Sequence, residues 1–155
     1  MMRKHVIGNW KMNGSAKQIN EVLGQLREQS FAARVSVCVP FPYLVLAAKL
    51  LAGSDVGVGA QNASAHVTGA YTGEVSAEML RDAGCELAIV GHSERRSLFA
   101  ESDDSISARL VRLWQAGLFG IVCVGETLGE REAGMAEARI EAQLAPVKAL
   151  LSSGL

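Results

Sequence analysis

The chain has 155 residues, of which 49% are hydrophobic and 20% are charged, with 15 Lys and Arg against 16 Asp and Glu. This length and apolar fraction are typical of a single domain over residues 1–155 and exclude a disordered chain. A net charge of −1 gives no broad basic field for a phosphate backbone, so we expect no nucleic-acid partner. A site for a small anion is still compatible with this charge, because it needs only one or two local cations.

The apolar segments of the chain are short. After the basic start from Met1 to His5, the apolar stretch reaches Asn9 within a few residues, whereas the core of a signal peptide needs about 7–15. The longest apolar run, 41–48, falls far below the roughly 18 residues of a membrane span. The cysteines are odd in number, widely spaced and without a C-x-x-C pair, which is typical of reduced thiols. We therefore expect a cytoplasmic protein with no membrane partner.

Five short runs rich in β-branched residues predict strands. Most lack regular apolar/polar alternation, which is typical of parallel strands buried on both faces. Helical patterns separate them, so the repeating unit is a strand followed by a helix. This order predicts an α/β fold with a parallel sheet and right-handed crossovers. The expected strands are residues 5–9, 35–39, 56–60, 87–90 and 120–124.

The helices are predicted from caps and apolar periodicity. Ser15 is a good N-cap, Pro42 suits the first turn of a helix that ends at Gly53, and Gly117 suits the residue after a helix. In the last helical segment Pro146 predicts a kink or a break. The expected helices begin at Ser15, Pro42, Ser76, Ser93 and Asp103, and a long one covers 130–151.

Two architectures suit this pattern. One is a doubly wound open sheet, and the other is part of an eight-unit barrel, which typically needs about 250 residues. Composition and periodicity leave both open. In either case ligands bind at the carboxyl ends of the strands. Polar and glycine-rich segments gather there, at residues 9–11, 61–62, 91–93 and 125–127.

Two basic side chains at strand ends are candidate site residues. Lys11 follows the first strand beside Asn9, where a cation can hold a phosphate or a carboxylate, although loops also carry merely solvated lysines. His92 ends the fourth strand and precedes a helix start at residues 93–96. The positive end of a helix disfavours a charged imidazole and favours a neutral ring that donates a hydrogen bond. The alternatives are a structural histidine and, for Glu94 to Arg96, an ordinary charged helix surface.

Patterns for metals and cofactors are weak. His5, His66 and His92 are scattered, and no pair has the spacing of a helical zinc site. The first strand runs into Gly8-Asn9-Trp10-Lys11 rather than a G-x-G-x-x-G loop. We expect neither a metal nor a cofactor.

Four motifs together resemble the triosephosphate isomerase family. They occur in the family's order and at its intervals, and the resemblance covers essentially the whole chain. The motifs are Gly8-Asn9-Trp10-Lys11-Met12-Asn13, Gly59-Ala60-Gln61-Asn62 followed by residues 69–76, Val90-Gly91-His92-Ser93-Glu94-Arg95-Arg96, and Cys123-Val124-Gly125-Glu126-Thr127.

The resemblance implies a (β/α)8 barrel, of which this chain holds the first five βα units. It implies a glycolytic and gluconeogenic enzyme that interconverts dihydroxyacetone phosphate and glyceraldehyde 3-phosphate through an enediolate, without metal or cofactor. Lys11 and Asn9 would contact the substrate, with Lys11 neutralising its charge. His92 would polarise the carbonyl and move protons between the two oxygens, the role that a neutral histidine at a helix start has in this family.

The resemblance also implies supporting residues and a homodimer. Glu94, beside Ser93, resembles the glutamate that supports the lysine and the asparagine. Residues 69–76 would form a loop that reaches into a second subunit. In that loop Thr72, followed by Gly73 and Glu74, would lie near the partner's Asn9.

The chain departs from the family pattern at its C-terminal side. It stops at Leu155 after the fifth βα unit, whereas the family has three more, which carry the glutamate base, the mobile lid and glycine-rich phosphate loops. Glu94 and Glu126 follow strands but match no motif of that base, so neither is assigned to it. Five strands of a barrel leave two open edges and an uncovered apolar interior.

We therefore expect the parent protein to be the isomerase, and this chain alone to be inactive or nearly so. We also expect it to aggregate, rearrange or associate with something that completes it. The alternatives are a non-catalytic, truncated relic that self-associates or binds small anions, and an unrelated α/β binding module.

Overall fold

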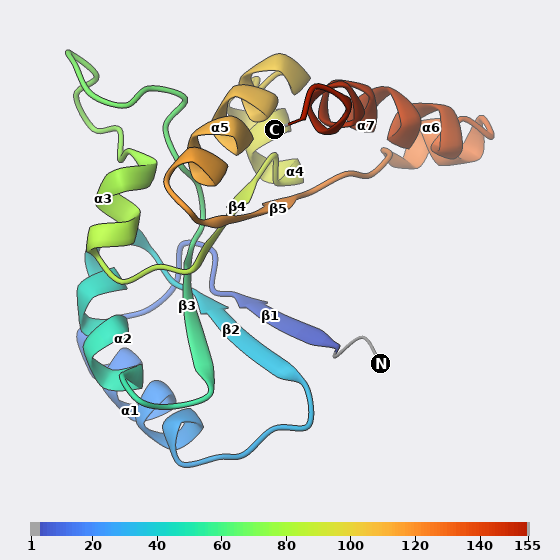
Figure 1. Cartoon of the computed structure of the whole chain (residues 1–155). Coiled ribbons are helices and arrows are strands. Elements are labelled where there is room, and N and C mark those ends of the chain that lie inside the picture. Colours follow the sequence, from blue (N-terminus) through green and yellow to red (C-terminus); the bar gives the residue numbers. More distant parts are fainter. Residues whose placement is uncertain (1–3, 155) are drawn as a thin grey trace.

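A curled parallel sheet forms the centre of the molecule in a computed structural model that describes residues 4–154 (Figure 1). Met1 to Arg3, the beginning of the basic N-terminal stretch, and Leu155 lie outside the described residues. The strands follow one another in chain order, and every neighbouring pair is parallel. The predicted α/β class and parallel sheet are confirmed. The strands are β1 (His5–Asn9), β2 (Arg34–Cys38), β3 (Val56–Ala60), β4 (Leu87–Val90) and β5 (Phe119–Val122).

Helices connect the strands, and serine or threonine side chains cap most of the predicted starts. The hydroxyl of Ser15 accepts a hydrogen bond from Gln18 N–H, and Ser76 accepts one from Met79 N–H in the same way. The helices are α1 (Ala16–Arg27), α2 (Leu44–Leu51), α3 (Ala77–Asp82), α4 (Ser93–Leu98), α5 (Asp103–Gln115), α6 (Leu128–Glu132) and α7 (Ala136–Ser152), with a 3₁₀ turn η1 (Phe41–Tyr43) before α2.

The structure corrects two helix predictions. Pro42 lies within η1, and α2 begins only at Leu44. The helical segment expected over 130–151, with a kink or a break at Pro146, is instead divided into α6 and α7 near its start, because Gly134 between them has a φ of 70°, which ends a helix. Pro146 does not break the segment, since α7 continues through it.

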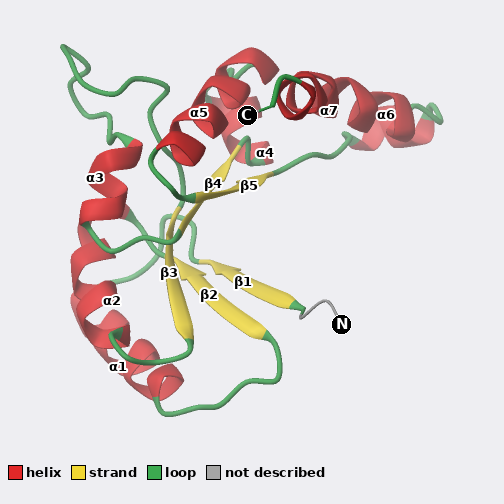
Figure 2. Cartoon of the chain, viewed as in Figure 1, coloured by secondary structure: helices red, strands yellow, loops and turns green. Residues whose placement is uncertain are grey.

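The main hydrophobic core lies between the sheet and the helices on its convex side (Figure 2). Every residue of β3 and β4 is buried, as predicted for central parallel strands. The helices contribute apolar side chains with essentially no exposed surface, namely Ile19, Leu23, Leu80, Ile106 and Leu113. This core fixes the sheet and thereby the positions at which the strands end.

A second, smaller cluster fills the concave side of the sheet. Cys38, Leu87 and Ile89 are buried there, and Ile7 and Ile121 pack against them. A Cβ atom at Gly59 would lie 2.4 Å from Leu87 Cδ1, so the glycine allows the close approach that the curl requires. The expectation of an uncovered apolar interior is therefore wrong for these three side chains, because the curl itself buries them.

The two outer strands leave the sheet open at its edges, as predicted. β1 and β5 each pair on one side only, and Val6 and Phe119 are 57% and 61% exposed. These strands are accordingly not buried like β3 and β4. No helix among residues 4–154 is long and apolar enough to cross a membrane.

A polar cluster lies at the amino ends of the strands, opposite the predicted site. Arg34 donates a hydrogen bond of 2.8 Å to Glu86, and its guanidinium lies 5.4 Å from the Phe119 ring centroid. His5 Nε2 lies 2.9 Å from Ser36 Oγ. Partial burial, and then the nearby Arg34 charge, lowers the pKa of His5.

Candidate active site

The loop after β1 holds Lys11 in an unusual backbone conformation. Trp10 N–H donates to Cys38 O at 3.0 Å, which continues the β1–β2 pairing past the strand end. The next residue, Lys11, has a φ of 53°, in the left-handed region that L-residues other than glycine rarely adopt. The side-chain oxygen of Asn9 accepts a hydrogen bond from Lys11 N–H at 2.9 Å. The predicted pair Asn9 and Lys11 is thus tied together by the loop itself.

Lys11 meets the segment after β4 through an ion pair. Its Nζ donates a hydrogen bond of 2.7 Å to Glu94 Oε1, and both side chains are about half exposed. This hydrogen bond holds the pKa of Glu94 below its usual range, so the carboxylate is ionised at neutral pH. The ion pair places a cation at the carboxyl ends of β1 and β4, where it remains accessible to an anion.

His92 lies at the start of α4, as predicted. It is the N-cap residue, and its Nδ1 accepts a hydrogen bond from Glu94 N–H at 3.3 Å. Glu94 Oε2 lies 3.4 Å from the same nitrogen, but only the backbone N–H has hydrogen-bond geometry toward it. An accepting Nδ1 carries no proton, so the proton of the neutral ring lies on Nε2. This tautomer can donate a hydrogen bond to a substrate oxygen.

Glu94 therefore joins the two predicted catalytic side chains. Its carboxylate binds Lys11, and its backbone N–H orients the ring of His92. Asn9 is held through the backbone of Lys11. Ser93 is the first residue of α4, and its carbonyl accepts a hydrogen bond from Ser97 Oγ at 3.0 Å.

Arg96 anchors this segment to the rest of the sheet. Its guanidinium donates to Gly91 O at 2.8 Å and to Cys123 O at 3.1 Å, and it forms an ion pair with Asp103. The side chain is only 13% exposed. The alternative of an ordinary charged helix surface is therefore wrong for Arg96, which ties the end of β4 to α5 and to the residue after β5.

Arg95 is partly buried and also forms an ion pair. It donates a hydrogen bond of 2.7 Å to Glu101, and Arg109 lies 3.1 Å from the same oxygen. The Glu101 side chain is only 4% exposed, so this ion-pair cluster is largely buried. It joins the end of α4 to α5.

The carboxylate of Glu126, which follows β5, forms an ion pair with Arg131. Glu126 accepts a hydrogen bond of 2.7 Å from Arg131. A hydrogen bond from its own backbone N–H, followed by that of Arg131, lowers the pKa of Glu126. A low pKa makes a weak base, which agrees with leaving Glu126 without a catalytic role.

The side chain of Gln143 in α7 secures the same loop. Its Oε1 accepts a hydrogen bond from Gly125 N–H at 2.8 Å, and its Nε2 donates to Gly125 O at 3.0 Å. Gln143 is the buried residue of α7 and is 3% exposed. We call this pair of hydrogen bonds the Gln143 clamp.

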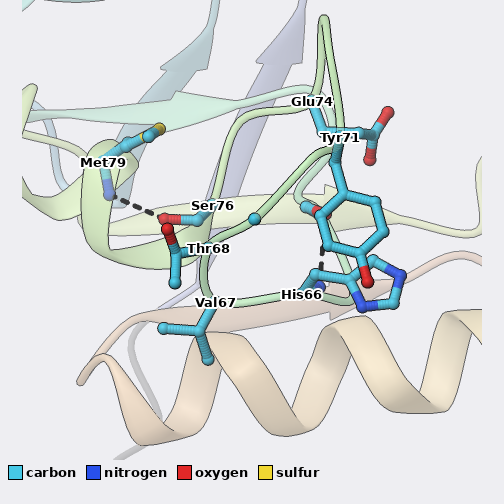
Figure 3. A pocket seen from close by; sticks show the side chains of 9 residues that line it. His66, Val67, Thr68, Tyr71, Glu74, Ser76 and Met79 are labelled. Carbon is cyan, nitrogen blue, oxygen red and sulfur yellow. Dashed lines mark hydrogen bonds between the residues drawn. The ribbon is translucent and has the colours of Figure 1, made fainter.

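The loop that carries Thr72, Gly73 and Glu74 projects away from the sheet (Figure 1). These three residues are exposed, and Gly73 has a φ of 91°. Figure 3 shows the base of the loop, where the rings of His66 and Tyr71 stack with their centroids 3.8 Å apart. A pocket lies among these rings and nearby residues that include Thr68, Glu74 and Met79. The loop therefore has internal structure of its own.

Sequence reasoning gave no role to several residues that build the site. Gln61 was identified only as part of a motif, yet its amide donates to Lys11 O and Cys38 O. Arg96 and Gln143 bind backbone carbonyls of other strand ends. For Gln61 the only signal was its place directly after β3, and for Arg96 its place just after His92. Gln143 had none.

A class of protein follows from this geometry. Five parallel βα units form a curled half-barrel, and polar side chains from the ends of β1 and β4 meet at its carboxyl edge. This is the arrangement of the active-site end of a (β/α)8 barrel. Among residues 4–154, no three His, Cys, Asp or Glu side chains come together in a way that could hold a metal ion.

Comparison with known proteins identifies the family. The family model for triosephosphate isomerase matches residues 4–154, and the chain belongs to this family. The triosephosphate isomerase of Thiobacillus denitrificans is 50% identical over 149 residues, covering 96% of this chain and 60% of that protein. The one of Bordetella pertussis is 52% identical over 147 residues, covering 94% and 59%.

A solved structure confirms the fold. The crystal structure of the triosephosphate isomerase of Bartonella henselae superposes with a TM-score of 0.89 at 38% identity, covering 94% of this chain and 61% of that one. The chain thus has the first five units of a TIM barrel. It spans about 60% of the length of the curated relatives it matches.

Proposed function

We propose that the complete protein interconverts dihydroxyacetone phosphate and glyceraldehyde 3-phosphate, and that the described residues supply its electrophilic half-site. The single observation that carries this proposal is the connected set Lys11–Glu94–His92, in which the Glu94 carboxylate binds the Lys11 ammonium group and the Glu94 backbone N–H orients the His92 ring. The family membership of the chain supports the same reaction.

In this proposal each side chain has a distinct task. Lys11 and Asn9 contact the substrate, with Lys11 binding its anionic group, and Asn9 also keeps the lysine backbone in place. Nε2–H of His92 donates a hydrogen bond to the substrate carbonyl and stabilises the negative charge that develops on its oxygen when a proton leaves the adjacent carbon. The same ring then transfers protons between the two oxygens of the enediolate. Residues 69–76 make the contact with a second subunit, and the enzyme acts as a homodimer in the cytoplasm without metal or cofactor.

The proton abstraction itself needs a carboxylate base, and the described carboxylates at the strand ends are engaged elsewhere. Glu94 is paired with Lys11, and Glu126 is paired with Arg131. Both have lowered pKa values, which weakens them as bases. We therefore propose that residues 1–155 form a single domain but have essentially no isomerase activity on their own.

The experiment compares two proteins. The first is the chain itself, with its 16.4 kDa mass verified by mass spectrometry. The second is a chimera in which residues 1–154 are followed by the remaining part of the Bordetella pertussis relative. We expect turnover of glyceraldehyde 3-phosphate by the chimera and none by the chain alone. Turnover by the verified chain would contradict the missing-base argument, and an inactive but folded chimera would contradict the proposed function.

Substitutions in the chimera test the individual roles. His92→Gln should lower kcat/KM by about 10²–10⁴, the usual contribution of a positioned proton-transfer group. Lys11→Ala should lower it at least as much, because the anion loses its cation. Lys17→Ala is the matched control, since Lys17 is an exposed lysine that pairs with Glu21 across one turn of the same helix. Unchanged kcat/KM in either test variant would remove that residue from the site.

A further inference from the structure

The side chain of Gln61 connects three strand ends. Gln61 follows β3 directly, and its Nε2 donates hydrogen bonds to Lys11 O at 2.8 Å and to Cys38 O at 3.0 Å. Lys11 belongs to the loop after β1, and Cys38 is the last residue of β2. One amide group therefore holds the carboxyl ends of β1, β2 and β3 in a fixed relation.

The backbone of Lys11 needs such support. Its φ of 53° is a conformation that an L-residue populates roughly tenfold less readily than the right-handed one. Asn9 Oδ1 accepts from the N–H of Lys11, and Gln61 Nε2 donates to its C=O. The peptide groups on both sides of the Lys11 Cα are thus fixed, one by a neighbour in sequence and the other by a residue 50 positions away.

The conformation of this backbone decides where the ammonium group lies. A change from left-handed to extended backbone at Lys11 would swing the Cα–Cβ bond and take Nζ away from Glu94, with which it now makes a 2.7 Å hydrogen bond. The lysine side chain is half exposed, so surrounding packing does little to hold it. The hydrogen bonds of Asn9 and Gln61 to the Lys11 backbone therefore have to hold the side chain in this direction.

We propose that Gln61 is a positioning residue that keeps Lys11 in the left-handed conformation and so aims its ammonium group at Glu94 and at a bound anion. The effect of Gln61 on the Lys11 backbone follows from the hydrogen bond between them. The consequence for anion binding rests on the proposed function. An acceptor at position 61 would face two carbonyl oxygens, so the amide NH₂ is the essential group.

Three substitutions separate the hydrogen bonds from other properties of the side chain. Gln61→Met removes the donor and keeps the length of the side chain without adding charge. Gln61→Glu is nearly isosteric but places a carboxylate against both carbonyls. Gln25→Glu is the matched control, because Gln25 lies exposed in α1.

The first readout is the NMR signal of Lys11 in the isotope-labelled chain, whose ¹³Cα shift and HN–Hα coupling report the φ angle. We expect both Gln61 variants to lose the left-handed values at Lys11 and the control to keep them. The second readout is titration with inorganic phosphate, followed at the Lys11 and His92 signals. We expect binding to weaken about tenfold in the Gln61 variants, matching the loss of the left-handed population.

The outcomes distinguish the inference from a purely structural role and from the proposed function. If the variants lower the melting temperature but leave the Lys11 signals unchanged, Gln61 only stabilises the fold and the inference is overturned. If the unmodified chain binds no phosphate, anion binding by this chain is overturned, while the Lys11 signals still decide the role of Gln61. If Gln61→Glu does not fold, Gln61→Met gives the same decision.

Discussion

Replacing Ala100 with glycine should stabilise the chain. Ala100 follows the last turn of α4 and has a φ of 52°. Among residues 4–154, Ala100 and Lys11 are the two residues other than glycine that have a positive φ. The residue after a helix commonly adopts this conformation, and glycine is preferred there because it has no Cβ. The methyl group of Ala100 is exposed, so its removal sacrifices little buried apolar surface.

The expected magnitude follows from two opposing effects. A left-handed conformation costs an L-residue about 1–2 kcal/mol, which glycine avoids. Glycine loses more conformational entropy on folding than alanine, which costs about 0.5–1 kcal/mol. Ala100→Gly should therefore raise the free energy of unfolding by about 0.5–1 kcal/mol, equivalent to roughly 2 °C in melting temperature for a chain of this size.

The matched control is the same substitution at Ala108, which is exposed in the middle of α5. There glycine gains nothing from φ, so the free energy of unfolding should fall by about 0.5–1 kcal/mol. Urea denaturation followed by circular dichroism measures both changes in the same solution conditions. A loss of stability in Ala100→Gly comparable with that in Ala108→Gly would refute the reasoning from backbone strain.

Three further predictions concern titration, thiol access and a buried amide. The pKa of His5 is lower in the folded chain than in the unfolded chain, so protonation favours the unfolded chain. The free energy of unfolding is therefore highest above pH 6.5 and decreases as the pH falls below it. The melting temperature of the unmodified chain should thus drop between pH 7.5 and 5.5, and that of His5→Phe should drop less. Equal drops in the two proteins would contradict this prediction. Burial raises the pKa of Cys38 and of Cys85 to about 12, so neither should react with a thiol reagent at pH 8 until urea unfolds the chain, and rapid labelling of the folded chain would count against this. Gln143→Ala removes the Gln143 clamp and should lower the free energy of unfolding by about 2 kcal/mol in urea denaturation, whereas a change below measurement error would show that water replaces both bonds.

Local sequence determined most of the secondary structure and the candidate residues. The N-caps Ser15 and Ser76 were predictable because a capping hydroxyl bonds a backbone N–H only three residues away. The β-branched runs of β3 and β4 predicted buried strands for a similar reason, since burial on both faces requires apolar side chains throughout. The motifs around Lys11 and His92 indicated the family, and the comparisons confirmed it.

Helix boundaries in the C-terminal segment depended on which of two helix-disfavouring residues, Gly134 or Pro146, ends a helix. Proline has a lower helix propensity than glycine, so Pro146 is the more obvious place for a helix to end than Gly134. However, α7 continues through Pro146, and the chain leaves α6 at Gly134. A proline inside a helix removes one backbone hydrogen bond and crowds the carbonyl four residues earlier, at a cost of about 3 kcal/mol, yet the assigned helix runs on past Pro146. A glycine that adopts a left-handed φ reverses the path of the chain.

The tertiary structure decided how the site is held together. Gln61 reaches Lys11 across 50 residues of sequence, and Arg96 reaches Cys123 across 27. Backbone carbonyls are present at every residue, so no side-chain pattern reveals which of them a distant amide or guanidinium will bind. That choice is made by the curl of the sheet, which brings the carboxyl ends of the strands together. The sequence by itself therefore determined which residues stand at the strand ends, and only the curled sheet determined which backbone groups hold them.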